Sequence, residues 1–108
     1  FSSLAATREW LTTDMAAAFM RAYRKTRLYM NEAPASEIGK AQKVYFPDID
    51  EAVLVNCIAT YQQLGCWTPH VDITPQAYDA VLDVFGYNGL LNERYAYDQV
   101  CCAPPGSA

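Results

Sequence analysis

Cysteine and histidine side chains can bind metal ions or act as nucleophile and base, and segment 62–81, QQLGCWTPHVDITPQAYDAV, carries Cys66 and His70. His70 is the single histidine of the chain, and the other cysteines are Cys57, Cys101 and Cys102. Most structural zinc sites use C-x2-4-C or H-x3-5-H frames, which this spacing lacks. Nothing in the intervening Trp-Thr-Pro linker brings the Cys66 thiolate to the imidazole either. We therefore predict no metal site and no catalytic residue.

Two charged clusters have simpler explanations than ligand binding. The acidic stretch PDIDE, residues 47–51, lacks the glycine and the distal glutamate of a calcium loop. Acidic residues at a helix start interact favourably with the helix dipole, so capping is the better interpretation. A basic run could bind an anion or an acidic partner. It lies in the second half of a helix, where cations interact favourably with the helix dipole, so a solvent-exposed helix face is the better interpretation. This run is Arg21, Arg24, Lys25 and Arg27.

Composition limits the possible functions. The 108 residues fit one domain, and 52% hydrophobic content is enough for a core. A net charge of −4 repels polyanions, so we expect no nucleic-acid partner. No apolar run reaches the ~18 residues that a membrane-spanning helix needs, and no signal peptide is visible. The chain begins with Phe1 rather than Met, from which we expect that an upstream portion has been removed.

Periodicity and capping residues predict a mainly α chain of four to five helices after one N-terminal extended strand. The small apolar run Phe1 to Thr7 suits a buried strand or an extended segment, and REWL suits one helical turn. A long helix follows, capped by Thr12 or Thr13 and stopped by Pro34. Its predicted buried face consists of Met15, Phe19, Ala22, Tyr23, Thr26 and Met30.

Three further helices are predicted from their start and stop residues. The first, over 34–46, has Ser36 near its cap and buries Ile38, Ala41 and Tyr45. The next starts at Asp48 or Asp50 and stops at Gly65. Its apolar stripe consists of Leu54, Cys57, Ile58, Tyr61 and Leu64. Within this stripe we expect Cys57 to behave as a small, chemically inert hydrophobic residue. The last runs from Thr74 and Pro75 to Gly89 and buries Tyr78, Val81, Leu82 and Phe85.

The end of the chain and Trp67 complete the prediction. A weak helical turn is expected in YAYDQV, and CCAPPGSA has the composition of a flexible tail, so we divide the chain into a helical segment, 1–100, and a tail, 101–108. Trp67 follows the Gly65 stop, and we expect that its own helix cannot bury it. Its ring should pack elsewhere, on this body or on a missing neighbour.

Five motifs in order resemble a known family. They are TREWL, AFMRAYRKTRLYMNEAP, YFPDID, YQQLGCW and ITPQAYDAVLDVFGYNGLL, which together span about Phe1 to Val100. The chain resembles the C-terminal portion of the periplasmic solute-binding proteins of ABC importers, in the group that handles nitrate, sulfonates, taurine and thiamine pyrimidine precursors. The CCAPPGSA ending is not a hallmark of that family.

The resemblance implies a piece of a two-lobed α/β fold whose lobes close on a small anion or heteroaromatic solute. The implied partners are the solute, an ABC permease in the membrane and the upstream part of the same protein. The implied location is periplasmic or extracytoplasmic, with membrane association through the importer and without a cofactor. Trp67, Tyr78 and Phe85 would dock the helices on a lobe. Because ligands gather at strand ends in open α/β sheets, Thr7 and Arg8 are the candidate ligand-binding residues.

Two alternatives remain open. The same resemblance extends to pyrimidine synthases of thiamine biosynthesis, which would need a reactive histidine and a cysteine-rich iron-binding stretch, so iron content would reveal such an enzyme. Here His70 is alone and the cysteines are scattered, and we predict no enzyme activity. A free-standing helical interaction domain would instead use the Trp67 region and the basic helix face, and would be soluble as a monomer.

Overall fold

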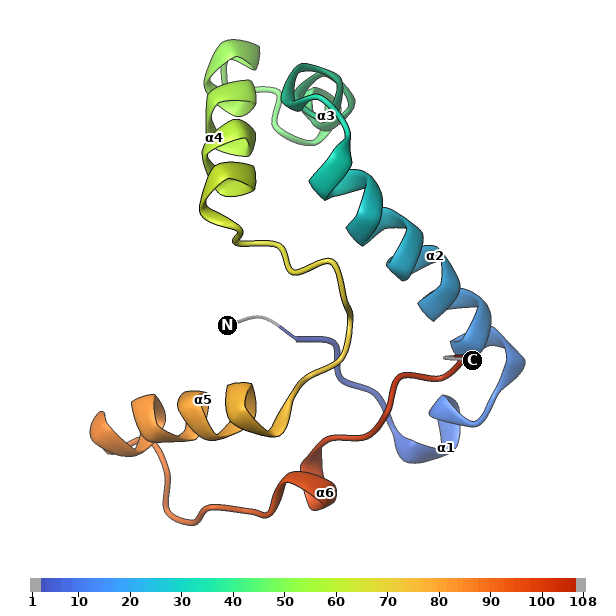
Figure 1. The fold of residues 1–108 in the computed structure, drawn as a ribbon, viewed down its shortest axis with the longest axis vertical. Helices are drawn as coiled ribbons and strands as arrows, with labels where there is room; N and C mark the ends of the chain where they lie inside the picture. The colour runs from blue at the N-terminus through green and yellow to red at the C-terminus, as the bar shows by residue number, and fades with distance from the viewer. Residues whose placement is uncertain (1–2, 107–108) are drawn as a thin grey trace. The chain divides into compact units, whose positions relative to one another are not determined.

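The computed structural model describes residues 3–106, which are mainly helical (Figure 1). The elements are α1 (Arg8–Leu11), α2 (Asp14–Glu32), α3 (Ala35–Gln42), the 3-10 helix η1 (Lys43–Tyr45), α4 (Glu51–Leu64), α5 (Pro75–Tyr87) and α6 (Tyr97–Val100). The predicted mainly α class is confirmed. Residues 3–106 contain no strand, so the predicted N-terminal strand is wrong for residues 3–7, while Phe1 and Ser2 lie outside the described residues.

An extended segment becomes a strand only when a neighbour accepts and donates its backbone hydrogen bonds. Residues 3–7 are exposed rather than buried, and no strand of the described chain lies beside them. The prediction failed because a short apolar run reveals extended backbone but not whether a partner strand is present.

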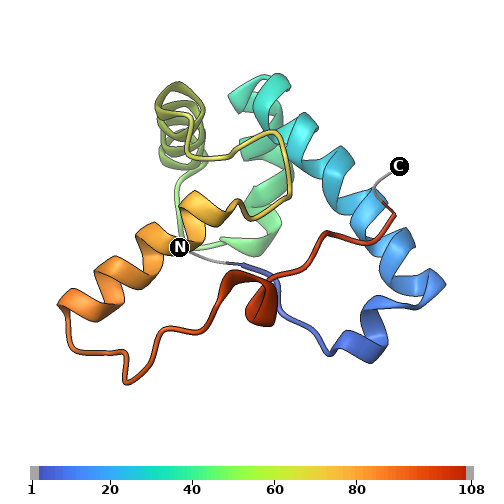
Figure 2. The ribbon, with the colours of Figure 1, turned by 60° about the horizontal axis from the view of Figure 1, so that its bottom comes forward.

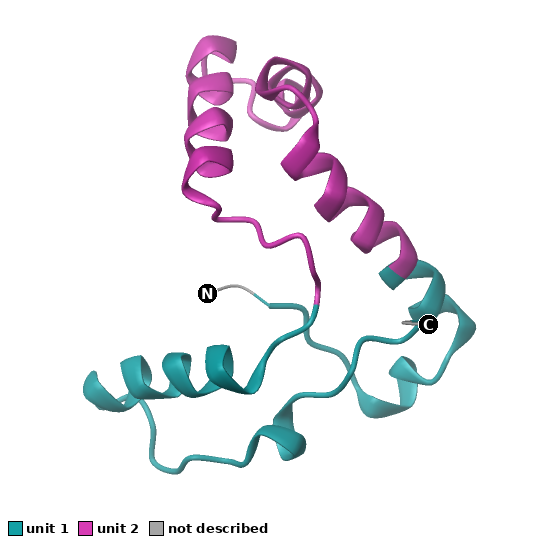
Figure 3. Ribbon diagram, viewed as in Figure 1, with its two compact units in different colours: residues 1–20, 72–108 teal, residues 21–71 magenta. Residues whose placement is uncertain are grey.

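The chain divides into two compact units (Figure 3). Unit 1 combines Phe1–Met20 with Asp72–Ala108, and unit 2 is Arg21–Val71, so the boundary passes through α2. Each unit has a small core. The buried apolar side chains are Ala16, Met20 and Leu82 in unit 1 and Ile38, Leu54 and Ile58 in unit 2.

The helix starts follow the predicted capping residues. Thr13 Oγ1 accepts a hydrogen bond from Ala16 N at 3.1 Å at the start of α2. Asp50 Oδ1 and Thr74 Oγ1 cap α4 and α5 in the same way. These caps satisfy amides that have no partner inside the helix. Ser36 lies near the start of α3, as predicted, but the N-cap is Pro34, whose carbonyl oxygen accepts the first bonds.

Two helices end in Schellman motifs, in which a residue with positive φ reverses the chain. Gly65, at φ +65°, follows α4: Gly65 N donates to Gln62 O, and Cys66 N donates to Tyr61 O. Gly89, at φ +68°, follows α5 with the same pair of bonds. Both predicted stops are confirmed, because only glycine adopts this conformation without steric cost.

The core of unit 2 lies between α3 and α4, which pack side by side (Figures 1 and 2). Ile38 is 1% exposed there. At Gly39 the helices approach so closely that an added Cβ would lie 2.5 Å from Val55 Cγ2. The predicted inward positions Ala41 and Tyr45 are exposed, because the contact runs through Ile38 and Gly39 instead.

Only part of the predicted stripe of α4 is buried. Leu54 and Ile58 face the core, whereas the other three members, Cys57, Tyr61 and Leu64, are exposed. The short helix α3 spans only 8 residues, so it covers one narrow line of the longer α4. Cys57 is therefore an accessible thiol and not the buried hydrophobe that was predicted.

The buried face of α2 is rotated by about one residue from the prediction. Ala16 and Met20 are buried, whereas Met15 is 70% exposed and Phe19 47% exposed. The remaining predicted positions are exposed at Ala22 and Thr26 and half-buried at Tyr23 and Met30. The run MAAAFM is apolar on every side of the helix, so periodicity alone does not select a face. The Phe19 ring packs edge-on against Trp10, with centroids 6.2 Å apart, whereas Met15 is largely exposed.

The side chain of Gln62 in α4 forms hydrogen bonds with the C-terminal end of α2. Its Nε2 donates to Met30 O and to Ala33 O, each at 2.9 Å. Carbonyl groups in the last turn of a helix lack intrahelical donors, so one side-chain amide here satisfies two acceptors.

We expect Gln62→Ala to lower the free energy of unfolding by about 1–3 kcal/mol, because two partly buried carbonyls lose their donor. The matched control is Gln63, an exposed neighbour on the same helix. Gln63→Ala should change the free energy of unfolding by less than ~0.5 kcal/mol. Urea denaturation followed by circular dichroism measures both. Equal effects of the two variants would contradict the role given to Gln62.

Candidate functional site

Thr7 and Arg8, the predicted ligand-binding residues, hold the backbone of unit 1. Thr7 is the N-cap of α1, and its Oγ1 accepts from Trp10 N at 3.1 Å. Arg8 Nη2 donates to Gln99 O at 2.6 Å and to Asp98 O at 3.3 Å. These carbonyls belong to the last turn of α6, where a cation also complements the helix dipole. Ligand binding by this pair stays a prediction.

Because Arg8 joins segments 90 residues apart in the sequence, its loss should loosen unit 1. We expect Arg8→Ala to lower the free energy of unfolding by about 1–2 kcal/mol, since charge-assisted hydrogen bonds exceed neutral ones. Arg94→Ala is the control: it removes an arginine of the same unit whose ion pairs with Asp79 and Asp83 are exposed, and should cost less than ~1 kcal/mol. Thermal denaturation measures the loss of stability in both variants. A larger loss of stability from Arg94→Ala than from Arg8→Ala would contradict the role given to Arg8.

Cys66 and Trp67 are parts of the helix stop, as the sequence predicted for this segment. Cys66 N donates the closing bond of the Schellman motif. The Trp67 ring packs edge-on against Tyr61 with centroids 5.5 Å apart. Trp67 is half-buried, and the expectation that its ring packs away from its own helix is wrong, because Tyr61 belongs to the last turn of α4.

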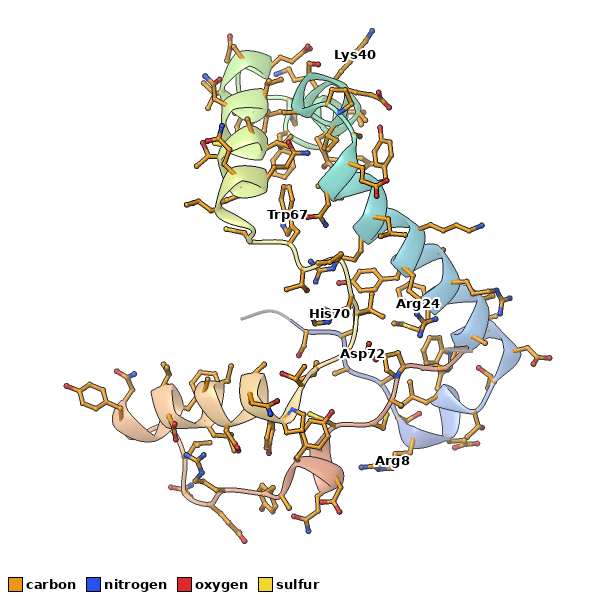
Figure 4. All side chains as sticks on the ribbon, viewed as in Figure 1. Arg8, Arg24, Lys40, Trp67, His70 and Asp72 are labelled. Carbon is orange, nitrogen blue, oxygen red and sulfur yellow. The ribbon has the colours of Figure 1, made fainter. Side chains whose placement is uncertain are left out.

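His70 lies on the segment that follows Trp67 (Figure 4). Its side chain is exposed, and its carbonyl oxygen accepts a hydrogen bond from Thr68 Oγ1 at 3.1 Å. No group of three or more histidine, cysteine or acidic side chains in residues 3–106 is arranged to hold a metal ion. The pairing of Cys66 with His70 that the sequence allowed has no observation in its favour.

Tyr78 and Phe85 are half-buried on the inner side of α5. Tyr78 packs edge-on against Tyr97, with centroids 5.8 Å apart, and its hydroxyl donates to Tyr95 O at 2.8 Å. Tyr97 in turn donates to Ile73 O. The chain after α5 therefore runs back toward α6 and is held on α5 (Figures 1 and 2). Val81, predicted to be buried, is 38% exposed, because this returning segment covers only the side that carries Leu82.

The outer side of α5 has a shallow apolar depression. Its lining residues are Ala80, Val81, Val84 and Phe85, which follow one another at helical spacing. Val84 is 51% exposed. Phe85, which is half-buried, also borders this depression, and its predicted docking role stays a prediction.

Sequence reasoning missed an apolar surface at the corner between α3 and α4. This corner surface consists of large side chains that are 39–74% exposed, namely Val44, Tyr45, Phe46, Ile49 and Val53. Lys43 holds its backbone: the Nζ donates to Pro47 O at 2.8 Å and also to Ile49 O.

The charged clusters act mainly on the local structure. Asp50 caps α4, which confirms the capping interpretation of PDIDE. Arg21 and Lys25 are exposed, as a solvated face requires. Arg24 and Arg27 depart from the prediction, because both are half-buried and the Arg27 guanidinium lies 5.5 Å from the centroid of the Tyr23 ring.

Two groups have shifted pKa values. The hydrogen bond from the Tyr29 hydroxyl to Glu37 Oε1, at 2.5 Å, raises the pKa of Tyr29, with smaller contributions from burial and from the Glu37 charge. Burial, followed by the neighbouring Cys102 charge, raises the pKa of the Cys101 thiol. Neither group lies among the candidate ligand-binding residues.

Compared with known proteins, the chain matches no protein-family model, no curated protein and no solved structure. In the described part of the chain, no helix combines the length and the apolar character needed to cross a membrane.

Proposed function

We propose that this chain is the C-terminal portion of an extracytoplasmic solute-binding protein that captures a small anion or heteroaromatic for an ABC importer. Its helices cover the flank of a larger α/β body formed by the upstream part of the same protein. Solute bridges two lobes and shifts the open and closed populations by its differential affinity for them. The order of the five motifs supports the family.

The observation that carries the proposal is the amount of apolar surface that the chain leaves uncovered. Met15 of α2 is 70% exposed, and the side chains of the corner surface in unit 2 are 39–74% exposed. Three buried apolar side chains in each unit are a small core for a self-sufficient domain. Apolar faces of this extent are typical of a surface that packs on a neighbour.

The second candidate is a free-standing helical interaction domain, whose predicted contact surface is the Trp67 region and the basic face of α2. The two candidates differ in what covers the exposed surface of the chain: the upstream part of the same protein or a separate partner. Size-exclusion chromatography and dye binding with the hydrophobic probe ANS distinguish them. The first candidate predicts ANS binding or self-association of the isolated chain and neither in the intact gene product.

The experiment for the function itself is a thermal-shift screen of the intact gene product with nitrate, taurine, an alkanesulfonate and a hydroxymethylpyrimidine. A ligand at 100 times its Kd stabilises the folded state by about 2.7 kcal/mol, which raises the melting temperature by several degrees. Chloride and an uncharged sugar are controls. A gene product that no anion or heteroaromatic stabilises would contradict the proposal.

Arg8→Ala in the intact gene product separates ligand contact from structure. If Arg8 binds an anionic solute, the variant loses a few kcal/mol of binding in addition to its loss of stability. Isothermal titration at a temperature where the variant is fully folded measures the binding alone. An unchanged affinity for the solute would show that Arg8 does not contact the ligand and only forms its hydrogen bonds to α6.

A further inference from the structure

The end of α5 places an asparagine directly before a glycine, at a site that neither the helix packing nor the proposed solute binding uses. Asn88 is the C-cap of α5, with φ −85° and ψ 5°, and Gly89 follows it at φ +68°. The side-chain Nδ2 of Asn88 donates to Val84 O at 2.8 Å, within the same helix. Both Asn88 and Gly89 are exposed, so solvent reaches the pair.

An asparagine in this position can lose its side-chain amide without an enzyme, and asparagine is among the chemically labile residues of proteins. The backbone nitrogen of Gly89 attacks Cγ of Asn88, so that an N–Cγ bond forms, the Cγ–Nδ2 bond breaks, and the backbone proton leaves with the amide as ammonia. Water then opens the cyclic imide at either carbonyl, which yields an aspartate or an isoaspartate at position 88. No electrons are transferred. Glycine favours the attack because it has no Cβ beside the nitrogen.

The helix stop opposes this reaction in the folded chain. Ring closure requires a rotation about ψ of Asn88 that carries Gly89 N from beside the Asn88 nitrogen, where a ψ of 5° holds it, to beside Cβ. The attacking nitrogen also donates to Gly86 O at 3.0 Å, and the leaving amide is held by Val84 O. Ring closure therefore requires that the last turn of α5 opens.

We propose that Asn88 is a spontaneous deamidation site whose rate is set by local opening of the last turn of α5. Opening breaks the bond from Asn88 Nδ2 and the two Schellman bonds, from Gly89 N to Gly86 O and from Leu90 N to Phe85 O at 2.9 Å. Residues 86–90 are all exposed, so this opening uncovers no buried side chain. Exposed helix ends open far more often than a whole domain unfolds. The fold therefore slows the reaction without preventing it.

The products do not fit this helix stop. An aspartate at position 88 cannot donate to Val84 O, and its negative charge lies at the C-terminal end of α5, where the helix dipole disfavours it. An isoaspartate adds one carbon to the backbone, which displaces Gly89 from its bond to Gly86 O. Deamidation thus makes the opening of this helix end permanent.

The chain provides its own controls, because its other asparagines precede residues that have side chains. These asparagines are Asn31, Asn56 and Asn92, which precede Glu32, Cys57 and Glu93. Asn92 is the matched control, since it is exposed and lies outside the helices in the same unit. The side chain of Glu93 obstructs the attack of its own backbone nitrogen, so Asn92 should react more slowly than Asn88 even without structure.

The test is incubation of the full chain at mildly alkaline pH, folded and in guanidinium chloride, with deamidation at each asparagine followed by peptide mapping and mass spectrometry. In guanidinium chloride we expect Asn88 to react at least ~tenfold faster than Asn92. In the folded chain Asn88 should react roughly ten- to a thousandfold slower than in guanidinium chloride, since only the last turn has to open. Asn88→Gln identifies the signal, because its longer side chain would have to close a larger ring.

Gly86→Ala separates local opening from other causes of a slow reaction. Alanine favours the helical state of the last turn, so this variant should slow the folded-state reaction about two- to fivefold and leave the rate in guanidinium chloride unchanged. Four results would overturn the proposal: equal rates for Asn88 and Asn92 in guanidinium chloride, equal rates for Asn88 in the folded and denatured chain, slowing beyond the stated range, or no effect of Gly86→Ala. None of these results depends on solute binding, so the proposed transport role is tested separately.

Discussion

Replacing Ile38 by alanine lowers the free energy of unfolding of unit 2 by about 2–4 kcal/mol, because the variant leaves a cavity between α3 and α4. Ile38 is the largest side chain in the described residues with less than 2% exposure. Ile49→Ala is the matched control, since this isoleucine is 39% exposed in the corner surface. It should cost less than ~1 kcal/mol in the isolated chain.

Urea denaturation followed by tryptophan fluorescence measures this difference. The Trp10→Phe background leaves Trp67 as the reporter, and Trp67 packs on Tyr61 inside unit 2. Trp67 and both substituted isoleucines lie in unit 2, so the Trp67 signal reports on the unit that contains the substitution. Equal losses for Ile38→Ala and Ile49→Ala would mean that α3 and α4 do not form this core.

Gly39→Ala should destabilise unit 2 although alanine is the better helix former. The added methyl group would lie 2.5 Å from Val55 Cγ2, and a valine in a helix has one strongly preferred rotamer with which to respond. Overpacking costs about 1–3 kcal/mol and helix propensity returns up to about 1 kcal/mol, so we expect a net loss of about 1–2 kcal/mol. The same Trp67 unfolding curve measures it.

Gly86 provides the control for this substitution. It lies in α5, and a Cβ built there meets nothing within 4 Å, so Gly86→Ala should stabilise unit 1 by about 0.5–1 kcal/mol. In a Val55→Ala background the clashing methyl is absent, so Gly39→Ala should cost much less than in the unmodified chain, and a double-mutant cycle should report this difference as a large interaction energy between the two substitutions. A stabilising Gly39→Ala would show that the helices lie further apart than described.

Helix ends were the most predictable part of this fold, because their chemistry is local. Asp50, Thr74, Gly65 and Gly89 act within a few residues of their own positions, and each was correctly placed from the sequence. Buried faces were less predictable. The MAAAFM run gives α2 no unique apolar side, and Cys57 is exposed because its neighbour α3 is short.

Long-range contacts gave no sequence signal at all. Gln62 donates to carbonyls about thirty residues away in the sequence, and a glutamine has many possible partners. The close approach at Gly39 is likewise a property of two packed helices, although an isolated glycine inside a helical pattern is a known hint of one. Arg8 was predicted to bind a ligand, which stays a prediction, and its hydrogen bonds to α6 had no sequence signal.

The central claim is that the exposed apolar faces of α2 and of the corner surface are covered by the rest of a larger protein. Hydroxyl-radical footprinting of the isolated chain and of the intact gene product tests it most directly, through the oxidation rates of Met15, Phe19, Tyr45 and Phe46. We predict at least tenfold slower oxidation of these four side chains in the intact product. Equal rates in both, or a natural product that consists of these 108 residues alone, would contradict the account.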